Sequence, residues 1–366
     1  MFNWLNKLVG KGSAADAAPP SDEAHTAAPD EGAVDEVSLE IDEDVSETEE
    51  PEITDKNLQA SEAPWDLGSC APSLEPEALQ HDLVKHLEAE WDNARTQHER
   101  EFLEALMATV WKGEMEIPAF PEAARKLDEL LQQGRDPTMM EVVRLVERDP
   151  ALVQRVWTRA SSAEFVVPPK GLHFAVSRIG FDELWRIAIQ ACMQSALFRV
   201  PGFQDSADRV RMFGLVSAEV SSELFGERRG AAYLAGMLHD VGKLLVYRHI
   251  TFDLVATPSS AAMVERLATT MHPSFGVLVS QSWQLGDEVA AVLGFHHDPM
   301  KAPEDYQRMV RIVRAANLAV YAVDAEKRGM KVNPLPAIKA VSQGLIANKD
   351  AMGIARKAFD HVQSLM

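Results

Sequence analysis

The residues best suited to chemistry gather in one short segment, "LAGMLHDVGKLLV" at 234–246. Its apolar residues recur at three-, four- and seven-residue spacing, the period of a helix packed into a core. The helix predicted here would carry His239, Asp240 and Lys243, whose polar groups are costly to bury. It would also carry Gly242, although glycine costs a helix about 1 kcal/mol relative to alanine. This combination needs an explanation beyond packing.

One explanation is a metal site, because five of the eleven histidines fall between residues 239 and 297. Imidazole suits transition metals, and a carboxylate can bridge two ions. The candidate ligands are His239, Asp240, His272, His296 and His297. Lys243 lies one helical turn beyond His239, where its charge can meet a phosphate, and Gly242 lets another backbone or a ligand come close.

The other explanation is structural. A buried His-Asp pair can cap and brace neighbouring helices, with Asp240 accepting hydrogen bonds from backbone or hydroxyl groups. The "HHDP" at 296–299 fits a helix C-terminus, where histidines favour the negative end of the helix dipole and Pro299 stops the helix. Spacing alone favours this structural explanation over the metal site.

The elements that must position these residues are predicted to be helices. Asp149 and Pro150 fit the cap and first position of a helix, and Gly180 fits a break within another. Strand-like alternation is nearly absent, so the predicted fold class is all-α. Helices are expected over 77–111, as one long or broken helix, and near 205–225, 230–248, 273–284, 304–325, 335–346 and 350–364, with another ending at 294–299.

The net charge of −20 belongs mostly to the start of the chain. Residues 12–55 contain 16 acidic residues and no Lys or Arg, and residues 1–66 hold 18 acids against 3 bases. This composition predicts a disordered acidic tail over 1–76, and it argues against non-specific nucleic-acid binding. The tail begins with a short amphipathic stripe at 1–11, which can be a docking peptide, a membrane-surface contact or a frayed end.

The two cysteines, Cys70 and Cys192, do not indicate a disulfide framework. No apolar run approaches the roughly 20 residues of a membrane span, and the start lacks the pattern of a secretory signal. We therefore expect a cytoplasmic protein without a transmembrane segment. The expected division of the chain is tail 1–76, helical connector 77–115, main domain 116–325 and C-terminal helical extension 326–366.

A family resemblance adds to these observations. The segment "AGMLHDVGKLLVY" resembles the core motif of the HD superfamily of metal-dependent phosphohydrolases. Residues 117–325 resemble more closely the HDOD domain, the HD-related output domain of bacterial signalling proteins. The blocks that carry this resemblance are "IPAFPEAARKLDELL", "VERDPALVQRVW", "AVSRIGFDELWR", "GMLHDVGKL", "HPSFGVLVSQSW" and "FHHDP". The resemblance implies an α-helical bundle and a role in bacterial signal transduction.

Departures from the HD pattern bear on activity. Alignment with active HD enzymes places Leu215 where a histidine ligand is needed and Asn317 near the terminal aspartate ligand. Leu215 cannot bind a metal, and Asn317 offers only a neutral oxygen. The glycine-tyrosine-proline signature of cyclic-di-GMP phosphodiesterases is also missing after His297. The resemblance therefore implies a degenerate site without catalytic residues, in which no metal is expected or one divalent ion binds weakly.

The leading hypothesis is a non-catalytic signalling module that binds a protein partner, with a nucleotide as a further candidate ligand. Its degenerate site would comprise His239, Asp240, Lys243, His272, His296 and His297. The alternative is a metal-dependent phosphohydrolase or cyclic-dinucleotide phosphodiesterase that uses these same residues, with Lys243 on the phosphate. A third hypothesis, a peripheral membrane adaptor, depends only on the apolar residues of the 1–11 stripe.

Overall fold

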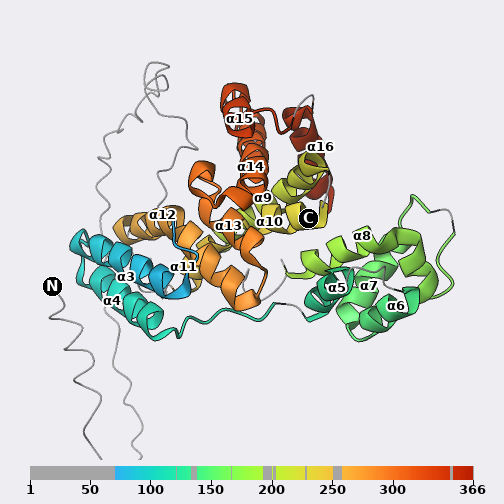
Figure 1. Ribbon diagram of the computed structural model, residues 1–366, viewed down its shortest axis with the longest axis horizontal. Coiled ribbons are helices and arrows are strands. Elements are labelled where there is room, and N and C mark those ends of the chain that lie inside the picture. Colours follow the sequence, from blue (N-terminus) through green and yellow to red (C-terminus); the bar gives the residue numbers. More distant parts are fainter. Residues whose placement is uncertain are drawn as a thin grey trace, which may run out of the picture. The chain divides into compact units, whose positions relative to one another are not determined.

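The computed structural model describes residues 71–120, 122–132, 138–165, 167–192, 200, 203–226, 229–249, 258–346 and 349–365 (Figure 1). Among these residues every regular element is a helix and no strand occurs, which confirms the all-α prediction. The predicted tail up to residue 70, its 1–11 stripe and Cys70 lie outside the described residues. None of the helices in the described ranges is long and apolar enough to cross a bilayer.

The segment expected to hold one long or broken helix folds as a hairpin of two helices, α3 (Pro76–Asp92) and α4 (Gln97–Lys112). A capping box starts α4, because Thr96 and Glu99 exchange side-chain and backbone hydrogen bonds. Gly113 ends α4 in the left-handed conformation, with a φ of 68°. The α3 helix packs against α12 (Pro258–Trp283), where Glu90 pairs with Arg266 at 2.8 Å.

Four helices follow the hairpin: α5 (Glu122–Gln132), α6 (Met139–Glu147), α7 (Pro150–Ala160) and α8 (Leu172–Cys192). The predicted cap of α7 is confirmed, because the Asp149 carboxylate accepts hydrogen bonds from the backbone N–H groups of Ala151 and Leu152 at 3.0 and 3.1 Å. The predicted break at Gly180 is confirmed too. Its φ of 79° and ψ of 169° interrupt α8, a conformation that favours glycine.

The remaining helices surround the histidine-rich segment. They are α9 (Gln204–Phe225), α10 (Arg229–Leu238), α11 (Gly242–Arg248), α12, α13 (Asp287–Phe295), the short 3₁₀ turns η3 (Pro299–Lys301) and η4 (Glu304–Tyr306), and α14 (Gln307–Lys327). The main packing partners are α9 with α10 and α14, α11 with α12, and α12 with α13. These contacts bring α10, α12, α13 and α14 around one core, although α10 and α14 are about 70 residues apart along the chain.

The closing helices α15 (Leu335–Ser342) and α16 (Ala351–Leu365) pack on this core, α15 on α14 and α16 on both α9 and α14. Phe359 of α16 is 1% exposed and contacts Phe213 edge-to-face. Lys349, just before α16, donates hydrogen bonds to the carbonyl oxygens of Glu223 and Leu224 at the end of α9. Both helices therefore belong to the body of the fold.

Candidate metal centre

The single helix predicted over 230–248 is wrong, because the chain turns at His239–Val241 between α10 and α11. Hydrogen bonds between residues three apart hold this turn: the Val241 N–H donates to Leu238 O at 2.9 Å, and the Lys243 N–H donates to Asp240 O at 3.1 Å. This is the tighter pattern of a 3₁₀ turn. The apolar spacing survives the turn because residues on both sides face the same core.

Gly242 has a steric role at this point. A Cβ atom added to it would meet the backbone of α12, at His272 O and at 2.6 Å from Gly276 N. The backbones of α11 and α12 therefore touch where only a hydrogen atom fits. This confirms the expectation that another backbone comes close to Gly242, and it brings His272 beside Asp240.

The helix predicted over 273–284 is also wrong in its start, because α12 begins at Pro258 and carries Pro273 in its interior. Proline has no N–H, so it cannot donate to the carbonyl of Thr269 four residues earlier. The ring of His272 uses this carbonyl instead, with Nδ1 2.7 Å from Thr269 O. A carbonyl oxygen only accepts, so the hydrogen of His272 is on Nδ1 and its Nε2 lone pair faces outward.

Two further imidazoles are oriented in the same way. His239 Nδ1 donates to Gly236 O at 2.8 Å, and His296 Nδ1 donates to Leu293 O at 3.1 Å at the end of α13. All three rings are fully buried. Backbone carbonyls thus fix three histidines with their Nε2 lone pairs free to accept a hydrogen bond or bind a metal.

Potential ligand atoms converge beside the His239–Val241 turn, α12 and the end of α13. His272 Nε2 lies 3.1 Å from Asp240 Oδ1, 3.2 Å from His296 Nε2 and 3.1 Å from His297 Nε2. Asp240 Oδ1 also lies 3.7 Å from His296 Nε2. Asp240, His272, His296 and His297, which we call the Asp-His cluster, form the one group of potential metal ligands found among the described residues.

Burial keeps the imidazoles neutral. It lowers the pKa of His239 and His272 to about 4, and it lowers the pKa of His296 and His297 as well. Burial by itself would raise the pKa of Asp240, but the Lys243 ammonium at 2.7 Å outweighs it and holds that pKa well below its usual range. At neutral pH the cluster therefore combines an ionised Asp240 carboxylate with neutral imidazole rings.

This donor set fits a divalent metal ion. Ligand atoms about 2.1 Å from a common ion lie roughly 3.0–3.4 Å from one another. Four of the six separations in the cluster, at 3.1–3.7 Å, are close to that range, and all four ligand atoms lie within 4.8 Å of one another. Imidazole nitrogen and carboxylate oxygen are also ligands that divalent transition metals accept. The structure therefore contains a buried Asp-His cluster that can bind a metal.

We expect Pro273→Ala to weaken metal binding without unfolding the protein. The restored N–H of residue 273 would compete for Thr269 O and release the His272 ring from its fixed orientation. Titration with Co²⁺ should show an affinity about tenfold lower than wild type, as for other supporting residues of metal ligands. Pro150→Ala, at the first position of α7, is the matched control and should leave Co²⁺ affinity unchanged. Unchanged Co²⁺ affinity in Pro273→Ala would refute this role.

Asn317 lies near the cluster, where the alignment places it, and its side chain forms a hydrogen bond with His239. Its side-chain amide is hydrogen-bonded to His239 Nε2. Because His239 already donates through Nδ1, its Nε2 accepts, so the NH₂ group of Asn317 must be the donor. The Oδ1 atom of Asn317 is buried without a hydrogen-bond partner. The lone pair of His239 is therefore used within the protein.

Leu215 does not line the space in front of Asp240. It is half-buried on α9, whereas the α9 residues that face Asp240 include Arg209, Val210 and Phe213. Leu215 lies two residues beyond Phe213, which is about 200° around the helix axis. The four α9 residues that line this space, Ser206, Arg209, Val210 and Phe213, offer neither imidazole nor carboxylate.

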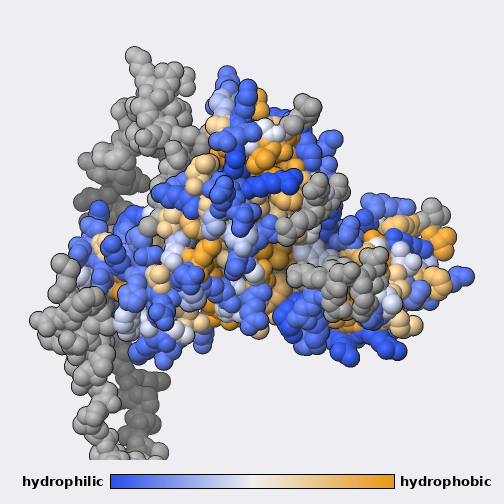
Figure 2. Space-filling view, in the orientation of Figure 1, coloured by the Kyte–Doolittle hydropathy of each residue, from blue (hydrophilic) through white to orange (hydrophobic). Residues whose placement is uncertain are grey.

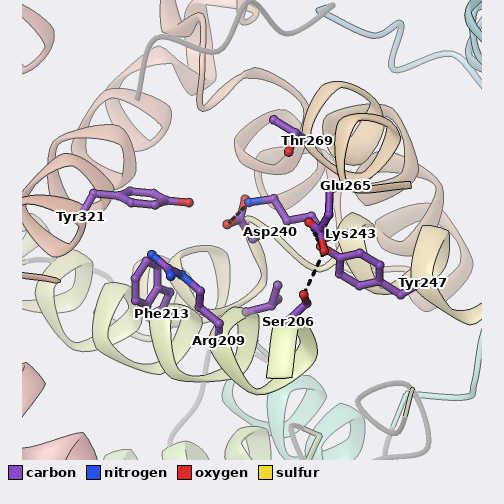
Figure 3. A pocket seen from close by; sticks show the side chains of 10 residues that line it. Ser206, Arg209, Phe213, Asp240, Lys243, Tyr247, Glu265, Thr269 and Tyr321 are labelled. Carbon is purple, nitrogen blue, oxygen red and sulfur yellow. Dashed lines mark hydrogen bonds and ion pairs between the residues drawn. The ribbon is translucent and has the colours of Figure 1, made fainter. Parts of the chain in front are cut away.

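In front of Asp240 is a pocket of about 150 Å³ (Figure 3). Lys243, Tyr247 and Tyr321 line it, and the Tyr321 hydroxyl points toward Asp240 and Lys243. None of the cluster histidines lines this pocket. Asp240 is therefore shared: Oδ1 faces His272 and His296, while Oδ2 accepts a hydrogen bond from Lys243 at 2.7 Å.

Sequence reasoning missed several residues of this region. Tyr321 follows Asn317 by one helical turn, so the period of α14 could have revealed it. Glu265 and Thr269 precede His272 on one face of α12 and were hidden by the late helix start predicted there. Arg314 is 4% exposed, and its Nη1 lies 3.5 Å from His297 Nδ1. Nothing in the local sequence pattern had marked it as part of this region.

A family model for the HDOD domain matches residues 117–299, half of the chain. The chain belongs to the HDOD family. A curated relative from Treponema pallidum (strain Nichols), described as uncharacterized, is 24% identical over 227 residues, covering 58% of this chain and 43% of the relative. This HDOD protein thus spans less than half the length of that relative.

Two crystal structures share the fold of this HDOD protein. One is an HDOD domain protein with unknown function from Geobacter sulfurreducens, with 22% identity and a TM-score of 0.53 over 69% of this chain and 94% of that chain. The other, from Shewanella amazonensis SB2B, bears a provisional description as a metal-dependent phosphohydrolase. It has 20% identity and a TM-score of 0.52 over 73% of this chain and 99% of that chain. At these identities the likeness shows the fold alone.

Proposed function

We propose that this HDOD protein is a non-catalytic signal-transduction module that acts by binding, with one divalent ion in the Asp-His cluster as a structural centre. The observation that carries the proposal is the separation of the cluster histidines from the pocket. A hydrolytic metal needs a coordination position open to water and substrate. A substrate in the pocket would meet Asp240 and Lys243 but none of the cluster imidazoles.

Two neighbours of the cluster support the same conclusion. Lys243 covers Asp240 Oδ2, and Asn317 covers His239 Nε2, so neither atom is available to a second metal. The α9 residues that line the pocket offer no further imidazole or carboxylate. The chemistry a bound ion would supply here is positive charge that balances the converging acceptors. The sequence favoured no metal or a weak one, whereas these distances favour one held by Asp240, His272, His296 and His297.

The proposed mode of action is contact with a protein partner. Large apolar side chains are exposed on α6 to α8 and the loop between α7 and α8, where Figure 2 shows hydrophobic residues among hydrophilic ones. They are Met140, Trp157, Val167 and Phe174, each between 41% and 60% exposed. Contiguous apolar patches mark interaction surfaces, and in this proposal these four side chains contribute to one. The pocket, at about 150 Å³, is too small for a cyclic dinucleotide, which argues against that class of ligand.

The second candidate is a metal-dependent phosphohydrolase. The observation that favours it is the cluster itself, together with Lys243 beside Asp240, since an ion and an ammonium group can both polarise a phosphate ester. Metal content alone does not separate the two candidates, because both would bind an ion. Turnover does.

The test combines metal analysis with a hydrolysis screen of the full chain. We expect about one Co²⁺ per chain, with an absorption spectrum typical of nitrogen and oxygen ligands, and its loss in Asp240→Ala. We also expect no hydrolysis of phosphomonoesters or cyclic dinucleotides with Co²⁺ or Mn²⁺. Hydrolysis by the wild type that disappears in Asp240→Ala would overturn the non-catalytic proposal in favour of the phosphohydrolase.

A further inference from the structure

We propose that a second pocket of this HDOD protein, at the end of α12, binds an adenine mononucleotide. This α12-end pocket has a volume of about 490 Å³, within the usual range of small-molecule sites. Residues from the segment 113–120 between α4 and α5, from α5 itself and from the end of α12 line it. No residue of the Asp-His cluster is among them, so the proposal does not depend on the metal centre.

Two aromatic rings give the α12-end pocket a surface for a planar ligand. Phe120 and Trp283 both line it, with ring centroids 5.1 Å apart and planes tilted by 44°. The Trp283 indole is held in place, because its Nε1–H donates to Pro118 O at 2.7 Å. Phe120 is only half-buried, so part of its ring is open to a ligand. Nucleobases stack on aromatic side chains of this kind.

Gln284 would recognise the edge of the base. It occupies the C′ position of a Schellman motif at the end of α12, where its N–H donates to Gln281 O at 3.1 Å. The Leu285 N–H completes this motif by donating to Ser280 O at 3.1 Å. The φ of Gln284 is 55°, in the left-handed region that favours glycine. A glycine would avoid this strain but would bring no side chain to the pocket that Gln284 lines. A glutamine amide places a donor beside an acceptor, which matches N7 and the N6 amino group of adenine.

Arg125 supplies a positive charge for the phosphate group. It is the one charged residue among the described residues that line the α12-end pocket. Its Nη1 pairs with Glu129 one turn along α5, but both side chains are about half exposed, so this pair is weak. A guanidinium has five N–H donors and can bind phosphate oxygens through two parallel hydrogen bonds. Aromatic rings, an amide and a guanidinium around one space are the groups that an adenine mononucleotide needs.

The experiment is calorimetric titration of the metal-free full chain with AMP, GMP and adenosine. We expect AMP to bind about tenfold more tightly than GMP, because the Gln284 amide matches adenine, and about tenfold more tightly than adenosine, which lacks the phosphate. Arg125→Met should weaken AMP binding about tenfold and leave adenosine binding unchanged. Lys126→Met is the matched control for lost charge, because Lys126 pairs with Glu122 and does not line the pocket.

A second variant tests the strained residue without risk of unfolding. Gln284→Gly relieves the left-handed conformation, so it should melt at the same temperature as wild type or higher, while its preference for AMP over GMP disappears. Gln343→Gly is the matched control. Gln343, at the end of α15, is the other non-glycine residue with a positive φ in the described part of the chain, at 45°, and it does not line the α12-end pocket. Its replacement should keep the preference for AMP.

The outcomes bear on this site separately from the proposed function. No AMP binding by the wild type, or equal AMP affinity in wild type, Arg125→Met and Gln284→Gly, would overturn the α12-end pocket as a nucleotide site. Equal affinity for adenosine and AMP would overturn the assignment to a mononucleotide, and tighter binding of GMP would overturn the assignment to adenine. The proposed function is tested by Co²⁺ binding and hydrolysis, which none of these titrations measures.

Discussion

Gly242→Ala is expected to lower the free energy of unfolding by about 3 kcal/mol or more, the upper range for overpacking. The added methyl group would meet the backbone of α12 at His272 and Gly276, and a backbone cannot move aside as a flexible side chain can. Separation of α11 from α12 would also move His272 away from Asp240. Urea denaturation followed by circular dichroism measures the loss of stability, and Co²⁺ titration measures the effect on the cluster.

Gly230→Ala is the matched control for this substitution. Gly230 is a helical residue of α10 whose added Cβ would meet the Trp185 ring at 3.7 Å, an ordinary contact. Its replacement should be neutral or stabilise the protein by about 0.5–1 kcal/mol through helix propensity. A Gly242→Ala protein as stable as Gly230→Ala would show that α11 and α12 are not in backbone contact at this point.

Asp240→Asn and Lys243→Met should each lower the free energy of unfolding by about 3 kcal/mol, because each leaves a buried charge without its partner. The two variants should respond differently to metal. Co²⁺ should restore most of the lost stability to Lys243→Met, where the ion balances the Asp240 carboxylate. Asp240→Asn should regain little, because it has lost a ligand of the cluster.

Thermal unfolding with chelator and with excess Co²⁺ measures this difference. Lys301→Met is the control for loss of a lysine charge, because its pair with Asp298 is exposed and should contribute less than about 1 kcal/mol. Equal stabilisation of Asp240→Asn and Lys243→Met by Co²⁺ would mean that Asp240 does not bind the ion. No stabilisation of the wild type by Co²⁺ would mean that the cluster is a structural core only.

The fold was predictable where the sequence contains local signals. The Asp149–Pro150 cap and the Gly180 break depend on backbone preferences of single residues, so both were found. The turn at His239–Val241 was not, because its apolar neighbours keep helical spacing across it. The early start of α12 was missed because Pro273 is a strong helix-breaking signal. The carbonyl that it leaves is bonded by His272 Nδ1 within the same helix, a side-chain contact that residue spacing does not reveal.

The residues that make up the candidate site could be predicted from the sequence, but the contacts that each of them makes could not. Residue type and the family pattern identified His239, Asp240, His272, His296 and His297, and the fold brings them together. They did not show that the Nε2 lone pair of His239 is engaged by Asn317, or that the other three histidines form one group of potential metal ligands with Asp240. That division depends on which ring nitrogen carries a hydrogen, and the backbone carbonyls that decide it come from the fold.

The buried amide of Asn317 has an evolutionary consequence. Asparagine and aspartate codons differ by a single nucleotide, and the two side chains have nearly the same shape. Such a mutation would replace the group that occupies His239 with an anionic oxygen beside Asp240. The α9 face would still lack a ligand, so this one step would not rebuild a complete second metal site. A complete second metal site would therefore require at least one further substitution, on α9, besides the change at residue 317.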